Sequence, residues 1–427
     1  MKIINVNKNQ DIRELALLTK RNREKLKQVQ DSVEEIINNV RENGDNALRE
    51  YAKKFDKVDL GEIRVTPEEI EEGYESVSPE LIAVLTEARD NIRAFHEKQL
   101  YAPVMLQTEG KKLYQMVTPV KRAGLYVPGG NYPYPSTVLM DAVPAIVAGV
   151  KEIAIITPAK GDGKVSANIL AAAKVCGITE VYKSGGAQAI AALAYGTESI
   201  KPVDMICGPG NVYVTAAKRS VFGDVNIDML AGPSEVLVIA DDKANVRYVA
   251  ADLLSQAEHD TQAASILVTT SYDFALKVKD EVERQLSELP TKEVAEISVR
   301  DYGTIFVTDD LENAFNIANE IAPEHLELAI ENAEDHVKDV YNAGTVFVGE
   351  YTPEPIGDYF AGTNHTIPTS GTAKFYSPLS TYDFMKRTSV VKYEKSEFDK
   401  VAEKVMLFAE TEGLFAHRNS IKVRTEE

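Results

Sequence analysis

The stretch Ser234-Glu-Val-Leu-Val-Ile-Ala240 decides the fold, because it is a short apolar run of strand length. Such a run is typical of a strand that is buried on both faces of a sheet. A helical pattern follows it from Ala244 to about Glu258. The same pair of elements then recurs twice, in the strands and helices expected at 264–269, 274–286, 303–308 and 311–321. Alternation of buried strands and helices predicts a parallel sheet with right-handed crossovers.

A second α/β unit is expected before this one. Two further apolar runs, Ala123-Gly-Leu-Tyr-Val-Pro128 and Glu152-Ile-Ala-Ile-Ile-Thr157, have the length and character of buried strands. Helical stretches rich in small residues lie near them, at 141–149 and 165–176. The simplest interpretation is therefore two α/β units along the chain.

The two ends of the chain are expected to be helical. Apolar residues recur at helical spacing between charged faces at 32–51 and 79–99, and a polar helical tail follows Asp399. The predicted fold class is α/β, with two incomplete Rossmann-like parallel-sheet domains, a helical N-terminal arm and a helical C-terminal tail. The domain bounds that we expect are an arm at 1–20, a larger domain from 21–125 and 236–380, a second domain at 126–235 and a tail at 381–427.

The net charge restricts the partners that the chain can bind. The sequence carries a formal net charge of −19, and a surface this negative repels a phosphate backbone. We therefore expect no nucleic-acid partner. A site for an anionic cofactor must be locally positive, or it must be built from backbone N–H groups and helix N-termini.

The cysteine content and the N-terminal sequence indicate a compartment. Only Cys176 and Cys207 are present, which excludes a disulfide framework and fits a reducing environment. The first 25 residues contain no continuous apolar run, so we expect neither a signal peptide nor a membrane anchor and predict a cytoplasmic protein. Cys207 is interpreted as a small buried residue rather than a nucleophile, because nothing near it in the sequence activates the thiol.

The six histidines are few enough to be weighed one by one. His259 closes the helix expected at 244–258, and Gln256 lies three residues before it, so both side chains project from one face. An amide oxygen beside an imidazole nitrogen can form half of a metal shell. A histidine at a helix end is also a common capping or dipole contact. His96 and His336 lie in charged helical runs and are expected to be solvated.

Two other segments combine an acid with a histidine. Asp358 and His365 belong to a Gly-rich, irregular segment, where the aspartate is either an oxygen ligand for zinc or the start of a turn. Glu324 and His325 follow Pro323 at the head of an expected helix, Pro323-Glu-His-Leu-Glu-Leu-Ala329. They are either ordinary helix-start residues or a carboxylate and an imidazole for proton transfer.

The remaining candidates are less specific. His417 lies near the chain end, where a histidine is usually solvated, and its possible partner Glu412 lies five residues earlier. Three glycine-rich segments either bring the backbone close to a ligand or only reverse the chain: 127–131, 185–188 and 208–211. None of them matches the dinucleotide-binding fingerprint, so they do not by themselves identify a nicotinamide cofactor.

The run Asn226-Ile-Asp-Met-Leu-Ala-Gly-Pro-Ser-Glu-Val-Leu-Val-Ile-Ala240, continued to Gln256-Ala-Glu-His259, resembles the signature of the histidinol dehydrogenase family. The match extends over more than thirty consecutive residues, and the resemblance covers the chain from about Pro119 to the end. Further matching motifs are Leu125-Tyr-Val-Pro-Gly-Gly130, Gly208-Pro-Gly-Asn211, Ala322-Pro-Glu-His-Leu326, Gly357-Asp-Tyr359, Gly362-Thr-Asn-His365 and Glu412-Gly-Leu-Phe-Ala-His417.

The resemblance implies a role for each matched residue. One Zn²⁺ per subunit would be held by Gln256, His259, Asp358 and His417. These ligands and His325 would contact the substrate L-histidinol, together with Ser234, His365 and Glu412. The NAD site would be lined by Tyr126, Gln188 and Asn211. The family is a homodimer with shared active sites, so His417 would come from the partner, and the tail at 381–427 would cross to it.

The resemblance also implies a reaction. L-histidinol would be oxidised through bound L-histidinal to L-histidine with two NAD, which is the last step of histidine biosynthesis. His325 would act as the general base on the alcohol, and Glu324 would activate the water that adds to the aldehyde. A zinc hydrolase is an alternative, although it leaves the glycine segments unexplained and the sequence lacks H-E-x-x-H. A metal-binding protein without activity is another, and the presence of both Glu324 and His325 argues against it.

Overall fold

The computed structural model describes residues 1–6, 22–102, 104–129 and 133–426. The chain divides into two units, one formed by Met1–Gln99 with Val120–Phe384 and the other by Leu100–Pro119 with Met385–Glu427. Within the part of the chain that the structure describes, no helix has both the length and the apolar character needed to cross a membrane.

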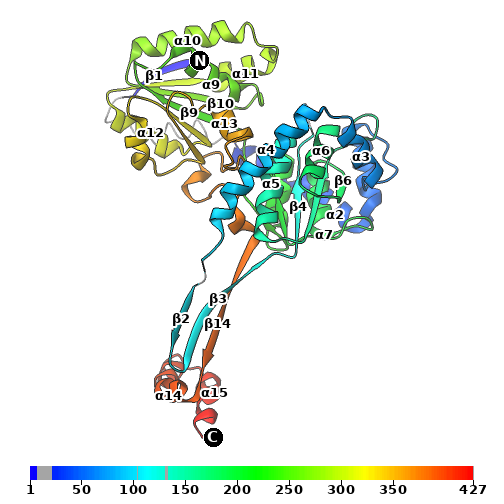
Figure 1. The fold of residues 1–427 in the computed structure, drawn as a ribbon, viewed down its shortest axis with the longest axis vertical. Helices are drawn as coiled ribbons and strands as arrows, with labels where there is room; N and C mark the ends of the chain where they lie inside the picture. Colours follow the sequence, from blue (N-terminus) through cyan, green and yellow to red (C-terminus); the bar gives the residue numbers. More distant parts are fainter. Residues whose placement is uncertain (7–21, 103, 130–132, 427) are drawn as a thin grey trace. The chain divides into compact units, whose positions relative to one another are not determined.

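A six-stranded sheet forms one half of the first unit (Figure 1). Every neighbouring pair of its strands is parallel, which confirms the predicted α/β class. The strands in spatial order are β1 (Lys2–Val6), β11 (Thr304–Thr308), β10 (Ala264–Thr269), β9 (Glu235–Ala240), β12 (His325–Ala329) and β13 (Thr345–Val348). All residues of β9 and β10 are buried, as expected for continuous apolar runs.

Helices cover both faces of this sheet, and β9 alternates between them. Val236 and Val238 belong to a core cluster with one group of helices, whereas Leu237 and Ile239 pack in a cluster on the other face. The first cluster involves α9 (Val246–Ala257), α10 (Tyr272–Leu286) and α11 (Lys292–Tyr302), and the second involves α12 (Leu311–Ile321). Short helices follow at η3 (Ala333–Asp339), α13 (Glu354–Tyr359), η4 (Thr372–Lys374) and η5 (Thr381–Phe384).

A five-stranded parallel sheet forms the other half of the first unit. Its strands in spatial order are β6 (Val181–Lys183), β5 (Glu152–Thr157), β4 (Arg122–Tyr126), β7 (Met205–Cys207) and β8 (Asn226–Ile227). The connecting helices are α5 (Pro135–Ala148), α6 (Ala167–Val175), α7 (Gly186–Tyr195) and α8 (Val212–Val221). This half corresponds to the second predicted α/β unit.

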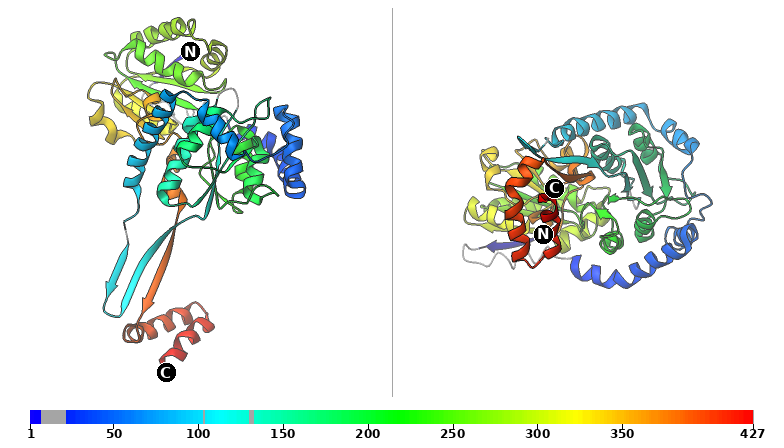
Figure 2. Two further views of the ribbon diagram at one scale, coloured as in Figure 1. Left: turned by 45° about the vertical axis from the view of Figure 1, so that its right-hand side comes forward. Right: turned by 90° about the horizontal axis from the view of Figure 1, so that it is seen from below.

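The N-terminal helices pack on the helices of the five-stranded sheet (Figures 1 and 2). They are α2 (Asn22–Tyr51), α3 (Pro67–Glu75) and α4 (Pro79–His96), with the short η1 (Ala52–Asp56) and η2 (Glu97–Gln99) at the ends of α2 and α4. Helix α2 contacts α7 and α8, α3 contacts α6, and α4 contacts α5. This packing differs from the expected grouping of 21–125 with 236–380, because the apolar face of α2 is buried against α7 and α8, and α3 and α4 contact helices of the same half.

The second unit combines an antiparallel sheet with two helices. The strands are β2 (Met105–Thr108), β3 (Lys111–Pro119) and β14 (Met385–Tyr393), with β3 in the middle. The helices α14 (Lys395–Thr411) and α15 (Phe415–Thr425) confirm the predicted helical tail. The sequence did not reveal that residues 100–119 pair with the strand that precedes this tail, or that the unit resumes at Met385.

Three local predictions were wrong. Residues 325–329 form strand β12 instead of a helix, because Ala322 adopts a left-handed conformation (φ 53°) that ends α12 and β12 inserts beside β9. Residues 2–6, expected as part of a helical arm, add strand β1 to the edge of the sheet, and the rest of that arm, 7–20, lies outside the described residues. His96 was expected to be solvated but is fully buried at the end of α4.

We predict that Leu48→Ala destabilises the first unit strongly. Leu48 of α2 is fully buried in the core that α2 shares with α7 and α8, so the substitution leaves a cavity and lowers the free energy of unfolding by about 2–5 kcal/mol. Urea unfolding followed by circular dichroism measures the change. The matched control is Leu276→Ala on α10, where the side chain is 40% exposed. Equal losses for the two variants would contradict the packing of α2 described above.

Candidate active site

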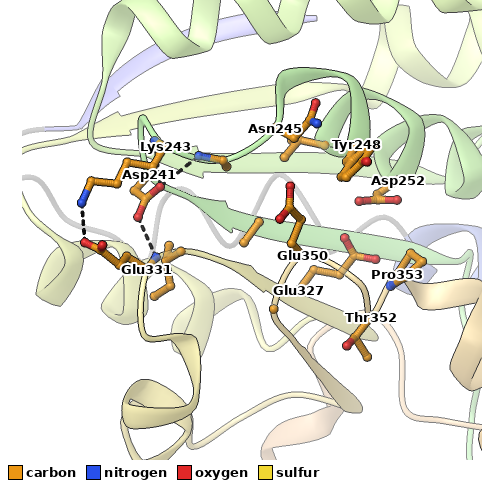
Figure 3. A pocket seen from close by; sticks show the side chains of 15 residues that line it. Asp241, Lys243, Asn245, Tyr248, Asp252, Glu327, Glu331, Glu350, Thr352 and Pro353 are labelled. Atoms are coloured by element: carbon orange, nitrogen blue, oxygen red, sulfur yellow. Dashed lines mark hydrogen bonds and ion pairs between the residues drawn. The ribbon is translucent and has the colours of Figure 1, made fainter.

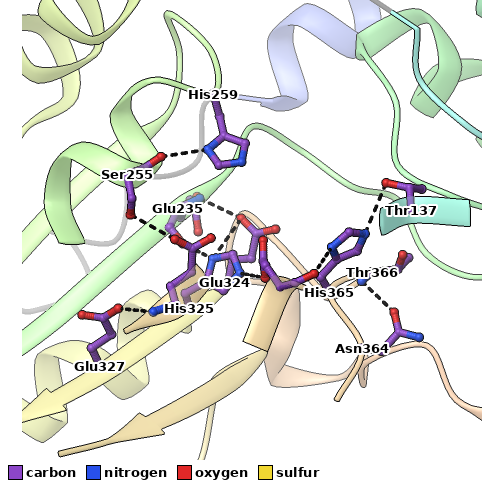
Figure 4. A network of polar contacts seen from close by, with 12 residues as sticks. Thr137, Glu235, Ser255, His259, Glu324, His325, Glu327, Asn364, His365 and Thr366 are labelled. Atoms are coloured by element: carbon purple, nitrogen blue, oxygen red, sulfur yellow. Dashed lines mark hydrogen bonds and ion pairs between the residues drawn. The ribbon is translucent and has the colours of Figure 1, made fainter. Parts of the chain in front are cut away.

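Three histidines from separate segments lie near the amino ends of β9 and β12 (Figure 4). His325 is the first residue of β12, and its register partner on β9 is Val236. His259 lies in the turn that follows α9, and His365 lies in the loop after α13. Because the connections of a parallel sheet bring distant segments to the same edge, residues about a hundred apart in sequence can form one site.

His259, Glu354 and Asp358 form a candidate metal centre. One ligand atom from each of these residues lies within 4.8 Å of the other two. Glu354 and Asp358 occupy positions i and i+4 of α13, so their carboxylates project from one face of the helix. Sequence reasoning missed Glu354, although its spacing from Asp358 was a usable signal, because the segment was interpreted as irregular rather than helical.

The surroundings of this cluster suit a cation with nitrogen and oxygen ligands. His259 Nδ1 donates to the carbonyl of Ser255 (3.0 Å), which leaves Nε2 able to coordinate. Gln256 is 1% exposed, and within the described residues its Oε1 has no hydrogen-bond partner. A buried acceptor without a donor is costly, and an ion would satisfy it. The imidazole and the two carboxylates match the ligand chemistry of zinc, and Gln256 lies three residues before His259, in the last turn of α9.

Glu324 and His325 form a buried acid–base pair beside the cluster. Oε2 of Glu324 accepts the backbone N–H of Glu235 (2.8 Å) and lies 3.8 Å from Nδ1 of His325. His325 Nδ1 donates to the carbonyl of Glu235 (3.1 Å), while Nε2 lies 3.4 Å from Oδ1 of Asp358. His325 therefore connects the pair with the metal cluster.

Burial and mutual charge shift the pKa values of these groups. Burial raises the pKa of Glu324 to about 8, despite the opposing effect of His325. Burial alone would lower the pKa of His325, but the carboxylates of Glu324 and Asp358 outweigh it and raise that pKa to about 10. Burial alone would raise the pKa of Asp358. The contact with His325 outweighs this effect and holds the pKa of Asp358 below its usual range. Burial, together with Asp358, raises the pKa of Glu354 to about 8.

The structure also brings the expected NAD-lining residues to one edge of the five-stranded sheet. Tyr126 ends β4, Gln188 lies in the first turn of α7, and Asn211 caps the N-terminus of α8. Strands β5 and β6 continue the sheet to one side of β4, and β7 and β8 continue it to the other. The carboxyl ends of β4 and β7 therefore flank a topological switch point, where open α/β sheets bind their ligands.

A buried ion pair fixes the loop at this switch point. Lys218 Nζ pairs with Asp228 and donates to the carbonyl of Gly208 (3.0 Å), and Oδ2 of Asp228 accepts the N–H of the same glycine (2.8 Å). Gly208 has φ +116°, and a side chain there would collide with the carbonyl of Tyr126. The loop thus needs glycine, and its backbone is held from both sides against the end of β4.

The remaining predicted site residues are Ser234, in the first unit, and Glu412 and His417, in the second. Ser234 is half-buried just before β9, so it is close in sequence to Glu235. Glu412 and His417 are exposed in the second unit, at the end of α14 and in α15.

Cys207 is fully buried at the end of β7, as predicted. Burial raises the pKa of its thiol well above the ordinary value, which makes a thiolate nucleophile there unfavourable.

A separate cavity of about 240 Å³ opens at the opposite edge of the six-stranded sheet, beyond the carboxyl ends of β9 and β12 (Figure 3). Asp241, Asp252, Glu327, Glu331 and Glu350 contribute to its lining. Although this is also a switch-point position, the acidic lining disfavours an anionic dinucleotide.

A larger cavity of about 540 Å³ borders His259 and Tyr359. Its walls are mostly apolar, and it gives space for an organic ligand beside the candidate metal centre.

The fold and the site together define a class of enzyme: an α/β protein that combines a carboxylate–imidazole cluster with a buried acid–base pair. The family described as histidinol dehydrogenase matches residues 19–425. The chain is 53% identical over 407 residues to histidinol dehydrogenase from Caldanaerobacter subterraneus subsp. tengcongensis, covering 94% of both chains. It is 50% identical over 394 residues to that of Bacillus subtilis, covering 92% of both. The crystal structure of histidinol dehydrogenase from Elizabethkingia anophelis matches with a TM-score of 0.94 and 41% identity, over 100% of this chain and 98% of that one.

The chain therefore belongs to the histidinol dehydrogenase family. This finding confirms the resemblance inferred from the sequence motifs and the expectation of an oxidoreductase. The zinc hydrolase and the metal-binding protein without activity, which the residues alone left open, are not supported by it.

We predict that Cys207→Ala leaves dehydrogenase turnover within about threefold of the wild type, because a buried thiol with a raised pKa contributes packing rather than chemistry. Steady-state turnover with L-histidinol measures the effect. Cys176→Ala is the matched control, since burial also raises the pKa of that thiol, to about 12. Loss of activity in Cys207→Ala alone would contradict the assignment and indicate a thiol mechanism.

Proposed function

We propose that this protein is a zinc-dependent L-histidinol dehydrogenase of the cytoplasm. It would convert L-histidinol through bound L-histidinal to L-histidine with two NAD, the last step of histidine biosynthesis. The observation that carries the proposal is the convergence of His259, Glu354 and Asp358 beside the buried pair Glu324–His325, in a chain of this family. The absence of any pairing between its two cysteines fits a reducing compartment.

Zinc would be held by Gln256, His259 and Asp358, completed by the partner subunit's His417. The buried oxygen of Gln256, which has no hydrogen-bond partner among the described residues, and the use of Nδ1 by His259 for its bond to Ser255 support this set. Glu354 is an additional candidate ligand, because its carboxylate belongs to the same cluster. When bound, zinc would grip the amine and imidazole of the substrate and act as a template rather than a redox centre.

His325 would take the proton of the substrate hydroxyl while a hydride leaves the carbon that bears this hydroxyl. Because Asp358 raises the pKa of His325, neutralisation of Asp358 by a bound cation favours the neutral imidazole that can accept this proton. The ionised carboxylate of Glu324 would then remove one proton from the water that adds to the aldehyde. The resulting hydrate anion would lose a second hydride and its remaining hydroxyl proton to give the carboxylate. Two molecules of NAD accept the two hydrides in turn.

NAD would lie at the switch point of the five-stranded sheet, lined by Tyr126, Gln188 and Asn211. The loop at Gly208 and the N-termini of α7 and α8 lie at this edge, and backbone N–H groups suit a pyrophosphate in a chain of net charge −19. Histidinol would also contact Ser234, His365 and the partner subunit's Glu412. The exposed Glu412 and His417 support a homodimer in which each tail completes the other subunit's site.

We predict that His417→Asn lowers the zinc content per subunit, because it removes one nitrogen ligand. Metal analysis after gel filtration measures the stoichiometry. His336→Asn is the matched control, since His336 is partly exposed and bonded to Asp339 (3.0 Å) outside the site. Mixing His417→Asn with His259→Asn subunits tests the shared site, because only a mixed dimer regains an intact ligand set. Unchanged zinc content in His417→Asn would refute the assignment.

We predict that Glu324→Gln slows the oxidation of L-histidinal by about 10²–10⁴-fold and that of L-histidinol far less, because only the aldehyde step needs an activated water. Stopped-flow measurement of reduced nicotinamide with each substrate separates the two steps. Glu331→Gln, an exposed glutamate paired with Lys243, is the matched control. Equal losses in both steps would discredit the role given to Glu324. Hydrolysis of an amide without formation of reduced nicotinamide would instead indicate a zinc hydrolase.

A further inference from the structure

Three consecutive residues of the loop after α13 are fastened to one stretch of α5. Nδ2 of Asn364 donates to the carbonyl of Met140 (2.6 Å), and the hydroxyl of Thr366 donates to Oδ1 of Asp141 (2.8 Å). Between them, Nε2 of His365 lies 3.2 Å from the hydroxyl oxygen of Thr137. The side chains of His365, Thr137 and Thr366 are all drawn together in Figure 4. This loop, which belongs to the six-stranded half, is therefore anchored on a helix of the five-stranded half.

The hydrogen bonds of His365 fix its tautomer. Nδ1 lies 3.1 Å from the backbone carbonyl of Asp358, and a carbonyl only accepts, so Nδ1 carries the hydrogen. In the neutral ring Nε2 is then an acceptor, and the hydroxyl of Thr137 is its donor. Both ring nitrogens are thus bonded within the protein.

These contacts lead to the candidate metal centre. Asp358 provides a carboxylate to the cluster, and the same carboxylate contacts His325. His365 holds the backbone of this residue, and Thr137, which is 2% exposed near the start of α5, holds His365. Partners behind a ligand commonly set its orientation, and their loss typically weakens metal binding.

We propose that Thr137 is a positioning residue: its hydroxyl orients His365, and His365 acts as a strut that holds Asp358 rather than as a hydrogen-bonding contact for histidinol. The inference rests on the proposed function and changes one assignment within it. Thr137 belongs to none of the sequence motifs described above, and it lies more than two hundred positions from His365.

The test compares Thr137→Val, which keeps the shape but removes the donor, with Thr137→Ser, which keeps the hydroxyl. Metal-free protein is titrated with Zn²⁺ in competition with a chelator, and KM and kcat for L-histidinol are measured on zinc-loaded protein. We expect Thr137→Val to weaken zinc binding and raise KM by about tenfold. The kcat should fall far less, and Thr137→Ser should restore both constants to within about twofold of the wild type.

Thr308→Val is the matched control. Thr308 is buried, and its hydroxyl accepts a hydrogen bond from Nδ2 of Asn313 (2.6 Å) at the end of β11. The substitution therefore removes one hydrogen bond of a buried threonine hydroxyl, here the acceptor, without touching His365. It should lower thermal stability while leaving zinc affinity and KM unchanged, which separates a general packing defect from a positioning effect.

Two results would overturn the inference. Zinc affinity in Thr137→Val equal to that of the wild type would mean that the strut does not position the ligand. A lower KM for L-histidinol in Thr137→Val would mean that Thr137 competes with the substrate for Nε2, and hence that His365 binds histidinol directly. Failure of the wild-type protein to bind zinc or oxidise L-histidinol would instead contradict the proposed function itself.

Discussion

The site depends on how buried carboxylates are balanced against few positive groups. Glu324, Glu354 and Asp358 lie close together, and the imidazole of His325 contacts Glu324 and Asp358. Burying several carboxylates is costly unless a proton or a cation is shared among them. The raised pKa values of Glu324 and Glu354, both about 8, express that cost, and the raised pKa of His325 expresses the compensation. A divalent cation at His259 and Asp358 would provide the charge that this arrangement otherwise lacks.

The two sheets carry the proposed functional residues at opposite edges. In the six-stranded sheet the acid–base pair lies where β9 and β12 begin, whereas in the five-stranded sheet the expected NAD residues lie where β4 and β7 end. The anchoring of residues 364–366 on α5 links these halves through buried hydrogen bonds. The geometry of Asp358 is therefore tied to both halves.

Most of the fold could be predicted from the sequence, because long apolar runs and helical periodicity act locally. Strands β5 and β10 have the predicted bounds, and α12 has them as well. The error at 325–329 arose because a proline followed by an acid is an ordinary helix start, and only pairing with β9 and β13 makes the segment a strand. The grouping of α2, α3 and α4 was missed for a similar reason: an apolar helix face shows that it is buried, but not against which sheet.

Some residues of the candidate site could be predicted from the sequence, and others could not. Spacing alone suggested Gln256 with His259, and the family resemblance supplied the roles of Asp358 and the acid–base pair. Neither residue spacing nor the family resemblance pointed to Glu354 and Thr137. Their contacts form only when α13 and α5 lie beside residues that are distant in the sequence. Neither residue type is distinctive, and a threonine in a helix usually bonds to its own backbone.

The acidity of the chain constrains how the five-stranded half could hold a dinucleotide. Lys218, a buried cation beside the loop at Gly208, is already paired with Asp228 and bonded to the backbone, so its charge is compensated. The backbone at this edge offers further donors: α7 starts at Gly186 and α8 follows the cap at Asn211. Helix N-termini present N–H groups and a partial positive charge without any basic side chain. The Lys218–Asp228 pair fixes the peptide groups around Gly208, so at the proposed NAD site an acidic protein would bind an anion by preorganised dipoles rather than by net charge.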